Sequence, residues 1–226
     1  MLNNYLKQYD RDGYVIIKNA INKKQCKLLM KKTIIPILHK KNIYLNKPKS
    51  WLDNNNQKVE GKLLYGKNGG HIISKKNKHF NFPALFNSKI LNNLLDKIHS
   101  RNNKKKWKFA DLAKEGLGWI HLRFPFYNYI DKNNDNVKCQ HDSFHLDGTN
   151  NKINIKQSSV ILPFITKVGK NEGGTAVIPG SHKNINEYIL RNNYKTNKNL
   201  YSVINNIVDK NKNNIIDMTG NVGDIL

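Results

Sequence analysis

The feature that most limits the possible folds is a series of short strand-like runs that begins at Leu117. The runs read LGWIHLRFPFYNYI, IKQSSVILPFITKV, GGTAVIPG and NNIIDMTGNVGDIL, and Asn, Gly and Lys turns separate them. Short β-branched and aromatic runs between turn residues predict antiparallel strands. Pro125 and Pro163 lie inside two of the runs, which predicts strand edges or bulges there. The predicted fold class is therefore mainly β with flanking helices, as in a jelly roll.

Helices are predicted outside and between these runs. An amphipathic helix begins at about Lys23, and a second covers residues 88–100, with Ser88 as its N-cap. A polar, partly helical segment covers about 183–212 and interrupts the strand series.

The remaining parts of the chain are less regular. Residues 9–13 are interpreted as a polar turn before a β-branched run, 14–18, and residues 40–80 as a long loop or insertion. No repeat or linker divides the 226 residues, so a single domain over 1–226 is expected.

The net charge of +23 does not by itself indicate nucleic-acid binding. Only four of the 39 basic residues are arginines, and arginine is the side chain suited to bidentate phosphate recognition. Lysine, asparagine and isoleucine, which A/T-rich codons encode, are all abundant. The base composition of the gene therefore explains the excess of lysine without any ligand. Salt-sensitive adhesion to polyanions is expected whatever the function of the protein. No specific nucleic-acid partner is expected. A basic nucleic-acid-binding protein stays as an alternative, ranked low because no nucleic-acid-binding motif accompanies the charge.

Two features bear on the compartment. No apolar run is long enough to span a membrane, and no basic-then-apolar leader follows Met1. The two cysteines, Cys26 and Cys139, are too few for a disulfide framework and neither has a CxxC partner. Cys26 is expected to be a small buried side chain of the first helix. An intracellular, cytoplasmic location is predicted.

His145 and Asp147, in the stretch FHLDG, are the most informative pair. Residues i and i+2 of a strand point to the same side, so an imidazole nitrogen and a carboxylate oxygen would converge on one point. They would form two members of a 2-His-1-carboxylate facial triad, a site typical of Fe(II). The alternative is a turn in which Asp147 caps its own backbone. A second pair, His141 and Asp142, ranks lower because adjacent strand residues point to opposite faces.

Four motifs occur in a set order: YDRDGYVIIKNAINKKQCKLL, FHLDG, NEGGTAVIPGSHK and GNVGDIL. In this order the chain resembles the phytanoyl-CoA dioxygenase family of Fe(II)/2-oxoglutarate-dependent oxygenases, over nearly its whole length except residues 40–80. The resemblance implies a double-stranded β-helix, a cupin-like jelly roll, that binds Fe(II) and 2-oxoglutarate. It also implies hydroxylation of a small-molecule or acyl substrate by O2, with release of succinate and CO2.

The resemblance also suggests roles for individual residues. His145 and Asp147 would bind the metal. The candidate contacts to 2-oxoglutarate are Gln157, Ser159 and Arg123, and the candidate pocket-lining residues are His121, Phe144 and Ser181. The alternative for Gln157 and Ser159 is a solvent-facing strand. His121 and Arg123 share one strand face, which either lines the pocket or lies on the surface.

The closing stretch departs from the family pattern. In the family, a GD-hydrophobic stretch leads to a distal ligand histidine and then to an arginine that clamps 2-oxoglutarate. In this chain the corresponding stretch, VGDIL, ends at Leu226. His182 is expected to be a polar turn residue and not a replacement ligand. The chain is therefore expected to be C-terminally incomplete, either a fragment or a truncated, inactive product, and an unpaired sheet edge favours the fragment. The alternative function is a non-catalytic dioxygenase-like binding protein.

Overall fold

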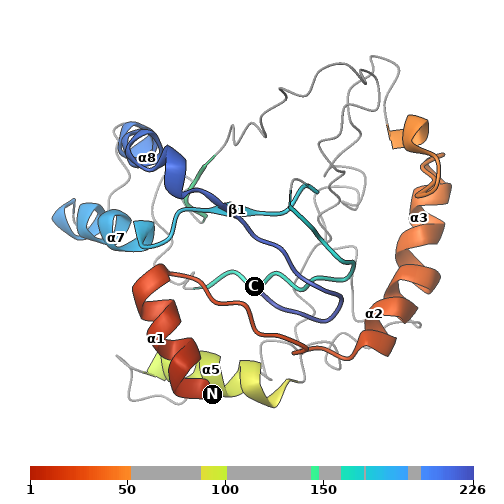
Figure 1. Cartoon of the computed structure of the whole chain (residues 1–226), viewed down its shortest axis with the longest axis horizontal. Coiled ribbons are helices and arrows are strands. Elements are labelled where there is room, and N and C mark those ends of the chain that lie inside the picture. The colour runs from red at the N-terminus through yellow and green to blue at the C-terminus, as the bar shows by residue number, and fades with distance from the viewer. Residues whose placement is uncertain (52–87, 101–143, 148–158, 171, 193–199) are drawn as a thin grey trace.

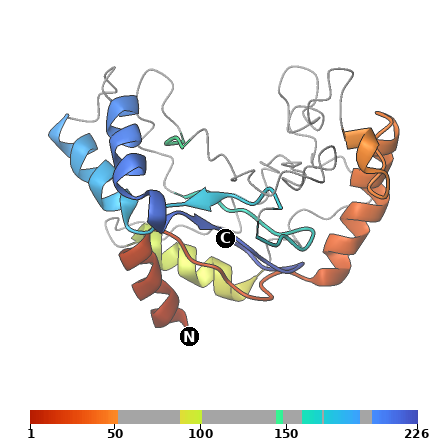
Figure 2. The ribbon, with the colours of Figure 1, turned by 45° about the horizontal axis from the view of Figure 1, so that its top comes forward.

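The computed structural model describes residues 1–51, 88–100, 144–147, 159–170, 172–192 and 200–226 (Figure 1). Its helices are α1 (Leu2–Asp12), α2 (Lys23–Leu29), the π-helical turn η1 (Met30–Ile34), α3 (Ile35–His39), the 3-10 turn η2 (Pro48–Trp51), α5 (Lys89–Ser100), α7 (Ser181–Arg191), α8 (Leu200–Lys210) and the 3-10 turn η5 (Lys212–Asn214). Its strands are β1 (Ala176–Val177) and β2 (Ile216–Asp217). Helices α7 and α8 lie at one end and α2 and α3 at the other, with extended chain between them (Figures 1 and 2).

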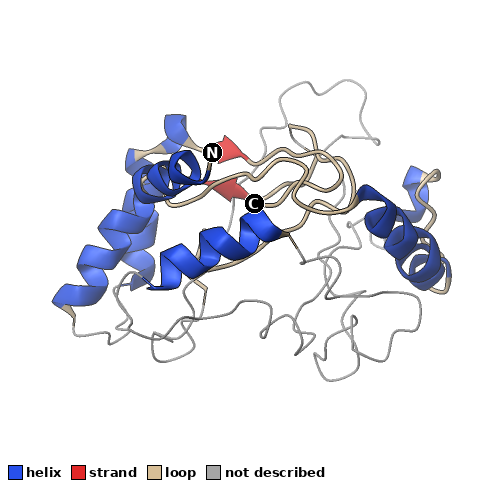
Figure 3. Cartoon of the chain, turned by 90° about the horizontal axis from the view of Figure 1, so that it is seen from below, coloured by secondary structure: helices blue, strands red, loops and turns tan. Residues whose placement is uncertain are grey.

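An antiparallel layer of extended chain joins the first and last parts of the sequence. Ile225 exchanges two backbone hydrogen bonds with Ile17, at 2.8 and 3.0 Å, and is bridged to Pro163 on its other side. The layer continues through β1 and β2, in which Ala176 lies opposite Asp217. Figure 3 shows these two strands as the short regular part of a longer run of extended chain. All the described pairings are antiparallel, as the strand pattern predicts.

Pro163 occupies a position where its missing N–H is tolerated. The N–H groups on either side, of Leu162 and Phe164, donate to the carbonyls of Leu226 and Asp224, both at 2.9 Å. Alternate N–H groups of a strand face opposite neighbours, so Pro163 directs its nitrogen away from this partner. No other described segment pairs with Pro163, which agrees with the predicted strand edge. Pro125 lies outside the described residues.

The first predicted helix is confirmed, with one irregularity. It begins at Lys23, because the side-chain oxygen of Asn22 accepts the N–H of Lys24 at 2.8 Å. The helix widens into the π-helical turn η1, where the N–H of Ile35 bonds to the carbonyl of Met30. Pro36 follows directly and has no N–H to donate, so the wider turn lies where a regular α-helix would lose a bond.

The other helices test three further predictions. α5 is capped as predicted, since Ser88 Oγ accepts the N–H of Leu91 at 3.4 Å. The polar turn predicted at residues 9–13 is wrong: residues 9–12 form the last turn of α1. Gly13 ends that helix in the left-handed conformation, with φ at 81°, and donates to the carbonyl of Tyr9. The predicted partly helical segment near the C-terminal part is confirmed by α7 and α8.

One apolar cluster connects the helices with the extended layer. Its fully or nearly buried members come from α1, α2, η1, α3, the loop after α3, α5 and the extended segments: Leu6, Val15, Ile17, Ile21, Cys26, Leu29, Ile34, Leu38, Ile43, Leu91, Leu94, Leu95 and Ile225. Cys26 is completely buried, as predicted, and burial raises the pKa of its thiol. A buried thiol with a raised pKa is a poor nucleophile, so Cys26 is a packing residue.

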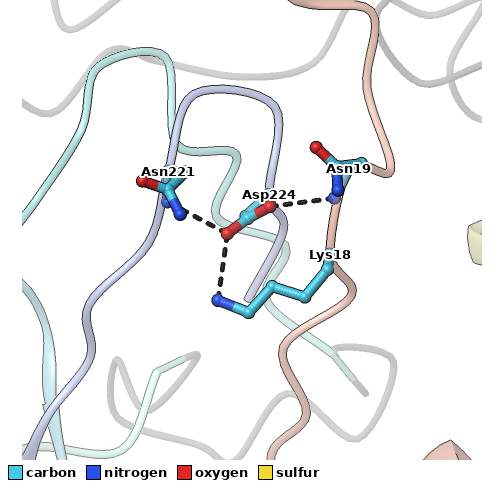
Figure 4. A network of polar contacts seen from close by, with 4 residues as sticks. All are labelled: Lys18, Asn19, Asn221 and Asp224. Atoms are coloured by element: carbon cyan, nitrogen blue, oxygen red, sulfur yellow. Dashed lines mark hydrogen bonds and ion pairs between the residues drawn. The ribbon is translucent and has the colours of Figure 1, made fainter.

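A buried carboxylate fastens the C-terminal segment to the N-terminal one (Figure 4). Asp224 accepts the backbone N–H groups of Asn19 and Asn221, at 2.8 and 3.0 Å, and lies 3.0 Å from Lys18 Nζ. Burial alone would raise the pKa of Asp224, but the hydrogen bonds from Asn19, Asn221 and Lys18 together hold it below the ordinary value. The carboxylate is thus stabilised in its charged form inside the fold.

Some predictions about the fold concern residues outside the described ranges. The strand run at 117–130 and most of the loop predicted at 40–80 are among them. The described part of that loop includes η2, where Trp51 Nε1 donates to the carbonyl of Tyr44 at 2.9 Å. The double-stranded β-helix stays a prediction. Across the ranges that the structure describes, no helix combines the length and apolar character needed to cross a bilayer.

We expect Asp224→Asn to lower the free energy of unfolding by about 2 kcal/mol, because the buried group loses charge-assisted hydrogen bonds. Urea unfolding followed by circular dichroism measures this. The matched control is Asp209→Asn on α8, where an exposed carboxylate pairs with Lys212 at 2.9 Å. That change should stay within about 0.5 kcal/mol. Equal losses in both variants would contradict the role given to Asp224.

The same carboxylate predicts a pH dependence. The folded chain holds the Asp224 pKa below that of the unfolded chain, so the unfolded state binds a proton more readily. The stabilisation is therefore complete above about pH 4, the ordinary aspartate pKa, and is lost as the pH falls through the lower folded-state value. As the pH falls below about 4, the urea concentration at the midpoint of unfolding should therefore decrease more steeply for the wild type than for Asp224→Asn.

Candidate metal-binding site

His145 and Asp147 lie within reach of one another, in irregular chain that ends in a turn and not on a strand. His145 Nε2 is 3.2 Å from Asp147 Oδ1, and the two side chains are 65% and 50% exposed. They belong to the short segment 144–147, drawn in green in Figure 1. The imidazole nitrogen and the carboxylate oxygen thus contact each other directly, and solvent or a small ligand can reach both.

The separation of these two atoms fits joint binding of one metal ion. Histidine nitrogen and carboxylate oxygen bind first-row divalent ions such as zinc at about 2.1 Å, so two neighbouring ligands at a right angle lie about 3.0 Å apart. The observed 3.2 Å is close to that value. Within the described ranges, no group of three or more His, Cys, Asp or Glu side chains is placed to hold a metal. The geometry thus supports a pair of ligands.

The structure describes only some of the other predicted site residues. Ser159 Oγ is buried and has no hydrogen-bond partner in the structure as described. A buried hydroxyl without a partner is unfavourable, and a polar ligand group would satisfy it. Phe144 is half-buried beside His145. The predicted residues Gln157, Arg123 and His121, and the lower-ranked pair His141 and Asp142, lie outside the described residues.

The PGSH motif packs against the end of α1. Gly180 donates its N–H to the carbonyl of Asp12 at 2.9 Å and has a φ of 79°. Ser181, predicted to line the pocket, is the first residue of α7 and is partly exposed. The motif therefore joins the glycine turn after β1 to the N-terminal helix, across more than half of the sequence.

His182 of this motif faces Gly13. A Cβ atom added at Gly13 would lie 2.8 Å from His182 Cγ, closer than side chains tolerate. His182 Nδ1 is buried and has no hydrogen-bond partner in the described structure. The expectation that His182 is a turn residue is wrong, because it is the second residue of α7. Its ring fills the space that glycine leaves at the end of α1. That His182 is not a metal ligand stays a prediction.

Charges around this contact favour an ionised Asp12. Arg11 Nε and NH2 donate to its two carboxylate oxygens, both at 2.7 Å. The hydrogen bond from Arg11 is the main reason that the pKa of Asp12 lies below its ordinary value, and Lys183 and His182 add to the effect. Since Asp12 also accepts from Gly180 through its carbonyl, the helix end is fixed by side-chain and backbone contacts together.

Comparison with protein-family models places the chain in a class whose members are typically oxygenases. The model for "Phytanoyl-CoA dioxygenase (PhyH)" matches residues 9–226, so the chain belongs to the phytanoyl-CoA dioxygenase family. The predicted resemblance is thereby confirmed. A comparison with curated proteins and another with solved structures gave no match.

Two contacts were not predicted from the sequence. The buried role of Asp224 depends on Lys18 and Asn19, which lie 206 and 205 positions away. No local pattern identifies such a partner. The contact of Gly13 with His182 has no local signal either. The end of the helix at Gly13 does have one, because Gly13 follows apolar residues at helical spacing and glycine is the usual terminating residue.

We expect Gly13→Ala to lower the free energy of unfolding by about 2 kcal/mol or more, because alanine is strained at this φ and its Cβ would overlap the His182 ring. Gly180→Ala is the matched control: its φ is 79°, and the nearest atom to an added Cβ, Arg11 O, lies 3.8 Å away. Gly180→Ala should show the strain alone. A smaller loss in Gly13→Ala than in Gly180→Ala would contradict the ring contact, as would additivity with His182→Ala.

Proposed function

We propose that this protein is an Fe(II)/2-oxoglutarate-dependent dioxygenase in which His145 and Asp147 bind the iron. The observation that carries the proposal is the 3.2 Å approach of Nε2 and Oδ1, in a chain that belongs to the phytanoyl-CoA dioxygenase family. A histidine and a carboxylate are two of the three protein ligands of the Fe(II) facial triad. The proposed fold is the double-stranded β-helix, in line with the antiparallel pairings.

The chain's own residues would supply binding and position. His145 would bind through Nε2 as the neutral imidazole, and Asp147 would bind through Oδ1 as the carboxylate. The Ser159 hydroxyl, buried and without a partner among the described side chains, would donate to a carboxylate of 2-oxoglutarate. Phe144, next to His145 in the chain, would add an apolar surface beside the site.

Bound Fe(II) and 2-oxoglutarate would supply the activation of O2, and the protein would position the substrate and limit access of water. The proposed products are a hydroxylated small-molecule or acyl substrate, succinate and CO2. A fold and a metal site of this kind serve many substrates, so the proposal stops at the substrate class.

We expect His145→Ala and Asp147→Ala each to weaken Fe(II) binding at least about 100-fold, more than the loss of residues that only support a ligand. Anaerobic titration with Fe(II) measures binding, and succinate formed from 2-oxoglutarate measures turnover. His39→Ala is the matched control, because His39 is an exposed histidine at the end of α3. It should leave both quantities unchanged.

Unchanged iron binding in His145→Ala and Asp147→Ala would refute the ligand assignment. Iron binding that depends on both residues, without any succinate from the 226-residue chain, would instead support one of the two alternatives: a non-catalytic dioxygenase-like binding protein or an inactive product. The two readouts therefore separate the metal site from the reaction.

A further inference from the structure

The helix from Lys23 to His39, here called the basic arm, has a charge pattern that the proposed reaction does not use. Its exposed side includes Lys23, Lys24, Lys27, Lys31 and Lys32. Residues 13–51 contain no aspartate or glutamate. Lys40 and Lys41, also exposed, follow the arm directly.

The basic arm differs from the other α-helices of the described ranges. Each of α1, α5, α7 and α8 carries at least one acid. On α7, Arg191 pairs with Glu187, and at the end of α8 Lys212 pairs with Asp209. None of the five lysines of the basic arm forms an ion pair with an acid of the described residues. A/T-rich codons explain abundant lysine, but they do not explain why one helix carries lysine without acid.

The arm also lies where a large partner can reach it. Figures 1, 2 and 3 agree in placing α2 and α3 at the far end from α7 and α8. The side opposite the lysines is buried through Cys26, Leu29 and Leu38. Residues three and four apart share one side of a helix, so Lys24, Lys27 and Lys31 form a stripe. The lysine side is thus fixed toward the outside.

An exposed apolar residue lies beside the stripe. Leu28, between Lys24 and Lys31, is 39% exposed. Lysine side chains place apolar stems against a lipid surface while their ammonium groups remain among the headgroups. A cluster of lysines close to a membrane surface is also a pattern that binds anionic lipid headgroups.

We propose that the basic arm docks the protein onto the surface of an anionic lipid bilayer. The lysines would contact the headgroups, and Leu28 would enter the interface beside them. Residues 13–51 contain no arginine, the residue that recognises individual phosphates bidentately. Lysine point charges suit a surface of diffuse negative charge, which favours lipid over a nucleic-acid backbone.

Vesicle sedimentation tests the proposal, with phosphatidylcholine alone and with phosphatidylcholine and phosphatidylserine in equal parts. The wild type should bind only the anionic vesicles. Replacing Lys24, Lys27 and Lys31 with glutamine should lower that binding about 100-fold, since each lysine near such a surface contributes about fivefold. Glutamine has a helix propensity close to that of lysine, so the arm should stay folded, which circular dichroism checks.

The matched control replaces three exposed lysines outside the basic arm, Lys7, Lys89 and Lys170, with glutamine. It therefore changes the net charge by the same amount as the arm variant. It should lower vesicle binding far less than the arm variant. An equal loss in the two variants, or no binding of the wild type to anionic vesicles, would overturn the proposal.

Leu28→Ser separates lipid from nucleic acid. It should weaken binding to anionic vesicles about fivefold, through the apolar surface removed, and leave binding to duplex DNA unchanged. If the arm variant loses DNA binding and keeps vesicle binding, the arm contacts nucleic acid and the lipid proposal is wrong.

Discussion

The pairing of the last seven residues with two distant segments is the contact on which the described structure depends. Gly223, Asp224 and Ile225 are all buried, and buried backbone groups need hydrogen-bond partners. Ile17 and Ile21 supply partners on one side, and Phe164 supplies them on the other. Asp224 adds a carboxylate that binds the turn after Ile17. Without either neighbour, this segment would leave polar groups buried and unpaired.

Three of the four family motifs share a structural task. The PGSH motif and the closing GD stretch both contact the N-terminal segment, which carries the DGY motif: Gly180 bonds to Asp12, His182 covers Gly13, and Asp224 binds Asn19. Only FHLDG supplies candidate metal ligands. In this chain, two of the motifs that carry the resemblance thus attach the first segment to the rest of the fold.

Local patterns predicted the local structure well. Ser88 before Lys89 is the predicted helix cap, and the helix predicted to begin at about Lys23 begins at that residue. His145 and Asp147 lie in contact, but in irregular chain that ends in a turn and not on a strand. The prediction missed α1 because its polar end, Tyr9 to Asp12, was interpreted as a turn. The signal was present, since Leu2, Tyr5, Leu6 and Tyr9 repeat at helical spacing and all pack into the core. The partners of Asp224 could not be predicted, because a carboxylate's long-range contact leaves no local pattern.

The pairing of Ile17 with Ile225 also sets an order of events during synthesis. Contacts this far apart in sequence slow folding, because closing the long loop loses entropy before the contact forms. The β-prone run from Val15 to Ile17 leaves the ribosome long before its partner does. An apolar strand in that position is a site for association with other nascent chains. Arg11 and Asp12 before the run, and Lys18 after it, place charges at both ends, as flanking residues that oppose such association do.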